Sequence, residues 1–284
     1  MNLCLRSLFF SCLGILLACG CVRGESPSAP LPERSPLEVL PDEISAVAWG
    51  PAEVVVWSHE FRFVPAVVST MERVVRELNS LGVPRQQLEH ITVGLNLKAS
   101  PVEWIFLLDG QWNARGVVRG KLGIHGESSR VDVSGELAVQ MREGVLFSVA
   151  GPRRIAVGST SLVRSCVSTM QAGSGTLRTR VEAMEETLPD APLHLVILER
   201  YHHVPGLEKG AFVARRSPEP WLEGRVDCVG IAGCERFQES LYRFVQASRA
   251  AVSPPSPEAL RFYTGLRFAP DGDSGKLVLD PVQL

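Results

Sequence analysis

Residues 136–151 read ELAVQMREGVLFSVAG, and this stretch decides the class of fold. Two runs rich in apolar residues flank Glu143 and Gly144, and the glycine supplies the backbone freedom that a tight turn requires. The pattern predicts two strands, at residues 136–141 and 145–150, that pair as a hairpin. We therefore expect antiparallel pairing to dominate the middle of the chain.

Further strands are predicted on both sides of this hairpin. The run EWIFLLDG at residues 103–110 is apolar at successive positions rather than at alternate ones, which is typical of a strand covered on both faces. The other predicted strands lie at residues 44–49, 90–97, 153–158, 193–199 and 223–229. The segment LRFAPDGDSGKLVLD at residues 266–280 predicts a final hairpin, because its Pro, Asp and Gly residues form a turn signal.

Helices are predicted from apolar residues that recur with a period of 3.6. The clearest helix runs from about Pro65 to Leu81, since Pro65 suits a first helical turn, and Gly82 followed by Pro84 suits a helix end. Other helices are predicted at residues 162–170, 177–188, 235–249 and 257–263.

The order of these elements predicts an α+β fold. Helix and strand patterns recur in a similar order in both halves of the chain, so we expect two similar lobes of antiparallel sheet with helices packed on one face. The first lobe is predicted at residues 43–172 and the second at residues 173–284. A single continuous sheet is the alternative architecture.

The N-terminus carries an export signal. Arg6 precedes an apolar stretch from Leu8 to Ala18, which is too short to cross a membrane as a helix, since spanning takes about 20 residues. We therefore assign residues 1–18 as a signal peptide and expect an extracytoplasmic protein.

The end of this signal holds a candidate lipidation site. Residues 16–21 read LLACGC, and Leu16, Leu17, Ala18 and Cys19 resemble the lipobox of bacterial lipoproteins. The resemblance implies that Cys19, or alternatively Cys21, becomes the new N-terminus and carries acyl chains such as palmitate. Two or more chains give stable anchoring, whereas one chain alone is marginal. Since Gly20 rather than Asp follows Cys19, the resemblance further implies a lipoprotein of the outer membrane that faces the periplasm.

Two further features bear on location and partners. Residues 19–42 contain five prolines and predict an extended tether between the membrane and the folded domain. The formal net charge is −2, from 29 basic and 31 acidic residues, so there is no positive field that would favour nucleic acid as a partner.

If Ala18 and Gly20 instead form an ordinary cleavage site, the protein is secreted and begins at Cys21.

Three cysteines lie in the body of the chain. Cys228 and Cys234, in DCVGIAGC, are close enough in sequence to form a local disulfide in an oxidising compartment; two buried thiols are the alternative. Their spacing does not fit a zinc site. Cys166 falls on the apolar face of a predicted helix, where a buried structural thiol is expected.

The segment HLVILERYHH is the nearest approach to a metal or acid/base site. His194, Glu199, His202 and His203 include the residue types that bind zinc, but adjacent histidines on extended backbone point in opposite directions. We therefore expect a solvated loop and assign no metal and no cofactor. The sequence also lacks the G-x-S-x-G elbow of serine hydrolases and the glycine-rich phosphate-binding motifs.

These observations favour binding over catalysis, and no catalytic residues are assigned. Arg215, Arg216 and Trp221, in ARRSPEPW, have the composition of a protein contact surface. We expect a lipid-anchored envelope protein that binds an envelope protein or a small ligand. The alternatives are an envelope hydrolase or metal-dependent enzyme that uses the region of His194, His202 and His203, and a secreted soluble binding protein.

Overall fold

The computed structural model describes residues 34–53, 79, 83, 85–122, 129–142, 144–173, 175–202, 204–215, 221–250 and 263–279. Contacts divide the chain into two compact units, and one boundary falls between Ala183 and Met184. The first, here called the seven-stranded unit, holds strands β1 to β7. The second, the five-stranded unit, holds strands β8 to β12.

In the seven-stranded unit, neighbouring strands are antiparallel and follow the order β1-β2-β3-β7-β6-β5-β4. Their bounds are β1 Ala46–Pro51, β2 Leu88–Asn96, β3 Glu103–Gly110, β4 Ser129–Val133, β5 Glu136–Arg142, β6 Val145–Val149 and β7 Arg154–Ser159. The hairpin predicted from ELAVQMREGVLFSVAG is confirmed as β5 and β6, in which Val139 pairs with Phe147. Both side chains are fully buried, so this hairpin contributes directly to the core.

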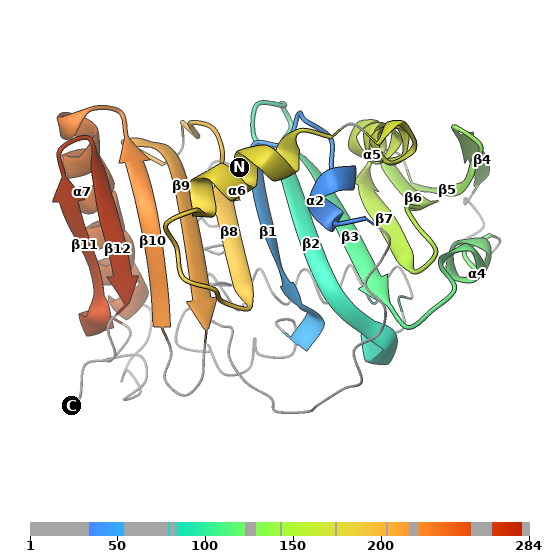
Figure 1. Ribbon diagram of the computed structural model, residues 1–284, viewed down its shortest axis with the longest axis horizontal. Coiled ribbons are helices and arrows are strands. Elements are labelled where there is room, and N and C mark those ends of the chain that lie inside the picture. Colours follow the sequence, from blue (N-terminus) through green and yellow to red (C-terminus); the bar gives the residue numbers. More distant parts are fainter. Residues whose placement is uncertain are drawn as a thin grey trace. The chain divides into compact units, whose positions relative to one another are not determined.

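Helices α2 (Pro36–Val39), α4 (Ala114–Arg119) and α5 (Thr160–Ala172) pack within this unit. Helix α5 contacts β3, β6 and β7, and α4 contacts β5, β6 and β7 (Figure 1). A 3-10 turn, η2, spans Arg85–Gln87, and helix α6 (Leu177–Glu185) contains the boundary between the units.

Local sequence explains where these helices begin and end. Helix α2 starts with a capping box, in which the backbone N–H of Ser35 donates to Glu38 at 2.8 Å, and Pro36 occupies its first turn. Helix α5 ends at Gly173, whose φ of 70° closes the last turn as its N–H donates to the carbonyl of Thr169. Asn113 caps α4 by accepting from the N–H of Gly116 at 3.1 Å.

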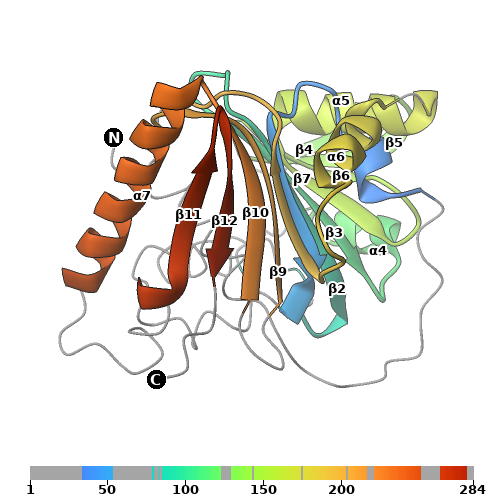
Figure 2. The same cartoon turned by 60° about the vertical axis from the view of Figure 1, so that its left-hand side comes forward.

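The five-stranded unit is also antiparallel, in the order β8-β9-β10-β12-β11. Its elements are β8 Leu193–Ile197, β9 Leu207–Arg215, β10 Trp221–Cys228, α7 Ile231–Ala250, β11 Leu266–Asp271 and β12 Ser274–Leu279. The predicted C-terminal hairpin is confirmed as β11 and β12. Figure 2 shows α7 running along this part of the sheet, and α7 contacts β9, β10, β11 and β12.

The surface on which α7 packs is formed by every second residue of the strands. Burial alternates along β10 and β12, so each strand presents one buried face and one more exposed face. Phe237 of α7 meets Phe268 of β11 with ring centroids 5.0 Å apart. Gly224 leaves room for the ring of Phe212, since a Cβ on Gly224 would lie 2.1 Å from a ring carbon. The core beneath α7 therefore combines aromatic rings with glycines on neighbouring strands.

The α+β class and the antiparallel pairing are confirmed. Helices predicted at residues 162–170, 177–188 and 235–249 correspond to α5, α6 and α7. Strands β4 and β9 and helices α2 and α4 were not predicted, and α2 lies inside the range predicted as the tether. The helix predicted at residues 65–81 lies outside the described residues, apart from helical Asn79. The one predicted at 257–263 does too, apart from Tyr263.

Candidate functional site

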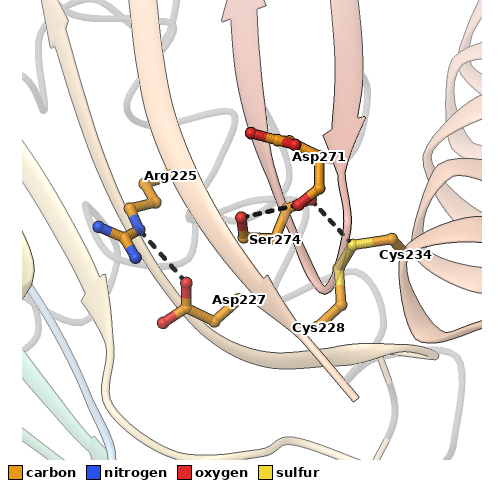
Figure 3. The surroundings of a disulfide bond; sticks show 6 residues. All are labelled: Arg225, Asp227, Cys228, Cys234, Asp271 and Ser274. Atoms are coloured by element: carbon orange, nitrogen blue, oxygen red, sulfur yellow. Dashed lines mark hydrogen bonds and ion pairs between the residues drawn. A yellow bond between two sulfur atoms is a disulfide. The ribbon is translucent and has the colours of Figure 1, made fainter. Parts of the chain in front are cut away.

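A disulfide joins the end of β10 to the first turn of α7 (Figure 3). Cys228 and Cys234 have an S–S distance of 2.02 Å and a Cα–Cα distance of 5.2 Å, and both are buried. The N–H of Cys228 donates to the carbonyl of Asp273 at 2.7 Å, and the sulfur of Cys234 lies 3.3 Å from the carbonyl oxygen of Ser274. The disulfide thus links β10 to α7, and the N–H of Cys228 adds a hydrogen bond to the turn between β11 and β12.

The structure describes three of the four metal candidates, His194, Glu199 and His202. His194 lies on β8, and its Nδ1 is 2.7 Å from Oε1 of Glu185, with both side chains 18% exposed. Glu199 is half-buried, whereas His202 is exposed and its ring packs edge-on against Tyr201. His203 lies outside the described residues. In the described part of the chain, no group of three or more His, Cys, Asp or Glu residues is placed to hold a metal ion.

The candidate contact residues lie at the end of the β9–β10 hairpin. Arg215, the last residue of β9, is the register partner of Trp221, the first residue of β10. Arg216 lies between them, outside the described residues. Cys19 and Cys21 are also outside the described residues.

A buried ion pair, which sequence reasoning missed, lies in the seven-stranded unit. Nε of Arg154 on β7 donates to Oδ1 of Asp109 on β3 at 2.8 Å, with side chains 2% and 8% exposed. Burial raises the pKa of Asp109, although the charge of Arg154 opposes this shift. Asp109 ends an apolar run and Arg154 begins a strand, so only the pairing of β3 with β7 identifies them as partners.

The only free cysteine among the described residues is Cys166, on α5. Its side chain is fully buried, and burial raises the pKa of its thiol to about 12. The thiolate is the nucleophilic form of cysteine, so Cys166 is an inert core residue rather than a catalytic one.

The segment before β1 is held against α5 and α6 by polar contacts. We call residues 34–43 the N-terminal clamp. Arg34 is central to it, because its guanidinium donates to the carbonyl of Met170 at 2.7 Å and its own carbonyl accepts from Arg154 at 3.0 Å. Glu38 pairs with Arg178 at 2.6 Å. These contacts bridge more than 100 positions of sequence, so no local pattern could reveal them.

The apolar side of the clamp is buried as well. Leu37, Val39 and Leu40 are at most 8% exposed and belong to the core of the seven-stranded unit. Asp42 accepts from both the N–H and the hydroxyl of Thr176, at 2.9 and 2.8 Å, just before α6 begins. The chain is therefore fixed to the unit from Arg34 onward.

A cavity of about 320 Å³ lies beside α4, between that helix and the β4–β5 hairpin. Arg115 and Arg119 of α4 and Arg130 of β4 line it, and we call it the arginine pocket. Sequence reasoning missed it, because neither α4 nor β4 was predicted. The spacing of Arg115 and Arg119, four residues apart, was the available signal.

No protein-family model matches this chain, and a comparison with curated proteins finds no match either. Among solved structures, crystal form III of TP0453 is similar, with a TM-score of 0.50 and 11% sequence identity over 87% of this chain and 93% of that one. Crystal form I has a TM-score of 0.46 at 11% identity, over 86% and 90% of the two chains. The likeness to form III extends to the fold alone.

Every helix within the described residues is too short or too polar to span a bilayer.

Proposed function

We propose that this protein is a lipid-anchored protein of the bacterial envelope that acts by binding a partner or a ligand. The disulfide between Cys228 and Cys234 is the observation that carries the proposal, because disulfides persist in oxidising compartments such as the periplasm and are rare in the cytosol. It supports export independently of the signal-like N-terminus. Acyl chains on Cys19, or on Cys21, supply the membrane contact, and Gly20 favours the outer membrane.

The N-terminal clamp supports a tethered arrangement. In an anchored protein, the folded domain must stay attached to the chain that leads to the membrane. Residues 34–43 provide this attachment, because they combine buried apolar side chains with the hydrogen bonds of Arg34 and Asp42. Force applied to the chain before Arg34 would therefore act on residues that pack into the core of the seven-stranded unit.

Binding is favoured over chemistry by the state of the reactive groups. The thiol of Cys166 is buried, and burial raises its pKa to about 12, so it is a poor nucleophile. We further propose that the two units are two similar lobes, each an antiparallel sheet with a packed helix, and that one or both lobes present the binding surface.

Metabolic labelling with a fatty acid tests the anchor. The full chain, Cys19→Ser and Cys21→Ser are expressed in a bacterial host, with Cys166→Ser as a matched control that leaves both N-terminal cysteines intact. We expect label in the full chain, Cys21→Ser and Cys166→Ser, and none in Cys19→Ser. Label lost only in Cys21→Ser moves the anchor to that residue. An unlabelled full chain whose mature N-terminus is Cys21 overturns the anchor and indicates a secreted binding protein.

A further inference from the structure

The arginine pocket has an excess of positive charge. Its lining includes three guanidinium groups, those of Arg115, Arg119 and Arg130, and one carboxylate, that of Asp132. Oδ1 of Asp132 accepts from the N–H of Gly135 at 2.9 Å and closes the turn between β4 and β5, so this carboxylate offsets only part of the positive charge.

Two of the three arginines form no ion pair with any described residue. Arg115 pairs with Glu136 at 3.1 Å, but no ion pair or side-chain hydrogen bond from a described residue engages Arg119 or Arg130. An arginine side chain carries five N–H donors in a planar fork, which matches the oxygens of carboxylate and phosphate groups. The pocket therefore offers guanidinium donors that no residue in the described part of the chain engages.

The rest of the lining is apolar. Leu122, Val131 and Leu137 border the same cavity. A volume of about 320 Å³ lies at the lower end of the range typical of small-molecule sites, and such sites combine apolar walls with a few oriented polar groups. An occupant with an anionic head and a modest apolar part fits both kinds of lining.

We propose that the arginine pocket binds a phosphate monoester with an apolar substituent. Such a group carries nearly two negative charges at neutral pH, which suits a lining with an excess of positive charge, and its three acceptor oxygens suit the guanidinium donors of Arg119 and Arg130. A carboxylate offers only two acceptor oxygens to the same donors. The site does not rest on the lipid anchor, because all its residues belong to the seven-stranded unit.

The test is calorimetric titration of the full chain, purified in a non-ionic detergent, with phenyl phosphate, inorganic phosphate and benzoate as probes. We expect phenyl phosphate to bind more tightly than inorganic phosphate, because it also fills the apolar part, and more tightly than benzoate. Adding salt is expected to weaken binding, because the attraction is between exposed charges. A second arm adds phosphatidic acid to the micelles, with phosphatidylcholine as its control, and asks whether it competes with phenyl phosphate.

Variants locate the site. The double variant Arg119→Gln with Arg130→Gln is expected to weaken phenyl phosphate binding by about tenfold or more. Arg243→Gln is the matched control, since Arg243 is an exposed helical arginine on α7 paired with Glu239, and it should bind as the parent does. Equal thermal unfolding of the variants excludes loss of structure as the cause.

Each outcome decides the proposal. Binding that depends on Arg119 and Arg130 supports it, and the competition arm then shows whether a lipid headgroup or only a soluble ester reaches the pocket. The proposal is overturned if no phosphate monoester binds, or if the double variant and Arg243→Gln bind it equally. Because the fatty-acid label is read in a separate experiment, failure here leaves the lipid anchor untouched.

Discussion

In the five-stranded unit, a disulfide between residues six positions apart holds the start of α7 against β10, and the ring of Phe237 on α7 packs against that of Phe268 on β11. In the seven-stranded unit, Arg154 reaches Asp109, 45 positions away, and the carbonyl of Arg34, 120 positions away, and no disulfide is present among its described residues. One unit thus relies on a local covalent link and the other on buried charge. We therefore expect the seven-stranded unit to be sensitive to loss of its buried ion pair and the five-stranded unit to be sensitive to loss of its disulfide.

The largest effect is expected from breaking the buried ion pair. Arg154→Met leaves the carboxylate of Asp109 buried without its partner and removes the donor to Arg34, which should cost about 3–5 kcal/mol of unfolding free energy. Urea denaturation measures the loss, and hydrogen exchange locates it in the seven-stranded unit.

A surface pair and a double variant provide the controls. Arg225→Met removes the partner of Asp227 in the five-stranded unit, where the arginine is 53% exposed, and should cost at most about 1 kcal/mol. Combining Arg154→Met with Asp109→Leu removes the orphaned charge and should recover part of the loss. A cost for Arg154→Met no greater than that for Arg225→Met contradicts the contrast between the units.

A smaller effect is expected from removing the disulfide. Replacing both Cys228 and Cys234 by Ala should cost about 2 kcal/mol, the value expected for so short a closed loop. The loss should appear as faster hydrogen exchange in the first turns of α7, because the disulfide joins this segment to β10. Cys166→Ala is the matched control in the other unit, and it should leave exchange in α7 unchanged. Faster exchange across β1 to β7 in the double variant would contradict a local role.

The sequence predicted those parts of the fold that depend on local patterns. The β5–β6 and β11–β12 hairpins follow from apolar runs around turn residues, and α7 follows from the spacing of Phe237, Leu241 and Val245. The close spacing of Cys228 and Cys234 likewise permits a disulfide without any knowledge of the fold.

The missed elements lack such local signals. Strand β4 reads SRVDV and is largely exposed at the end of the strand order, so its stability comes from pairing with β5 rather than from its own apolar face. Helix α4 has six residues, too few for a clear period.

The charged sites depend on segments far apart in the chain. The partners of Arg154 and Arg34 are set by tertiary structure, and the arginine pocket needs α4 and β4 together. A single sequence therefore reveals the hairpins, whereas the polar sites emerge only when the strands are placed side by side.

The smallest expected effect is on the pH dependence of stability, and it also belongs to the seven-stranded unit. Hydrogen bonds from Arg178 and from the N–H of Ser35 lower the pKa of Glu38 below its ordinary value of 4.5. Stability from this group is present above pH 4.5 and is lost as pH falls through the folded-state pKa. Burial raises the pKa of Asp109 above 3.8, so its contribution has the opposite sign and is lost as pH rises through the folded-state pKa.

The two carboxyl groups should therefore have opposite effects on how the free energy of unfolding changes with pH. Glu38→Gln removes a carboxylate that stabilises the folded state only when it is ionised. The free energy of unfolding should therefore fall less steeply as pH drops below 4.5. Asp109→Asn removes a group that favours the folded state as it becomes protonated, so stability should fall more steeply as pH drops toward 3.8. Urea midpoints measured across this range test both slopes, with Glu239→Gln on α7 as an exposed carboxyl control. Parallel curves for the two variants would mean that these carboxyl groups do not differ in environment, and the contrast between buried and surface charge within the seven-stranded unit would fail.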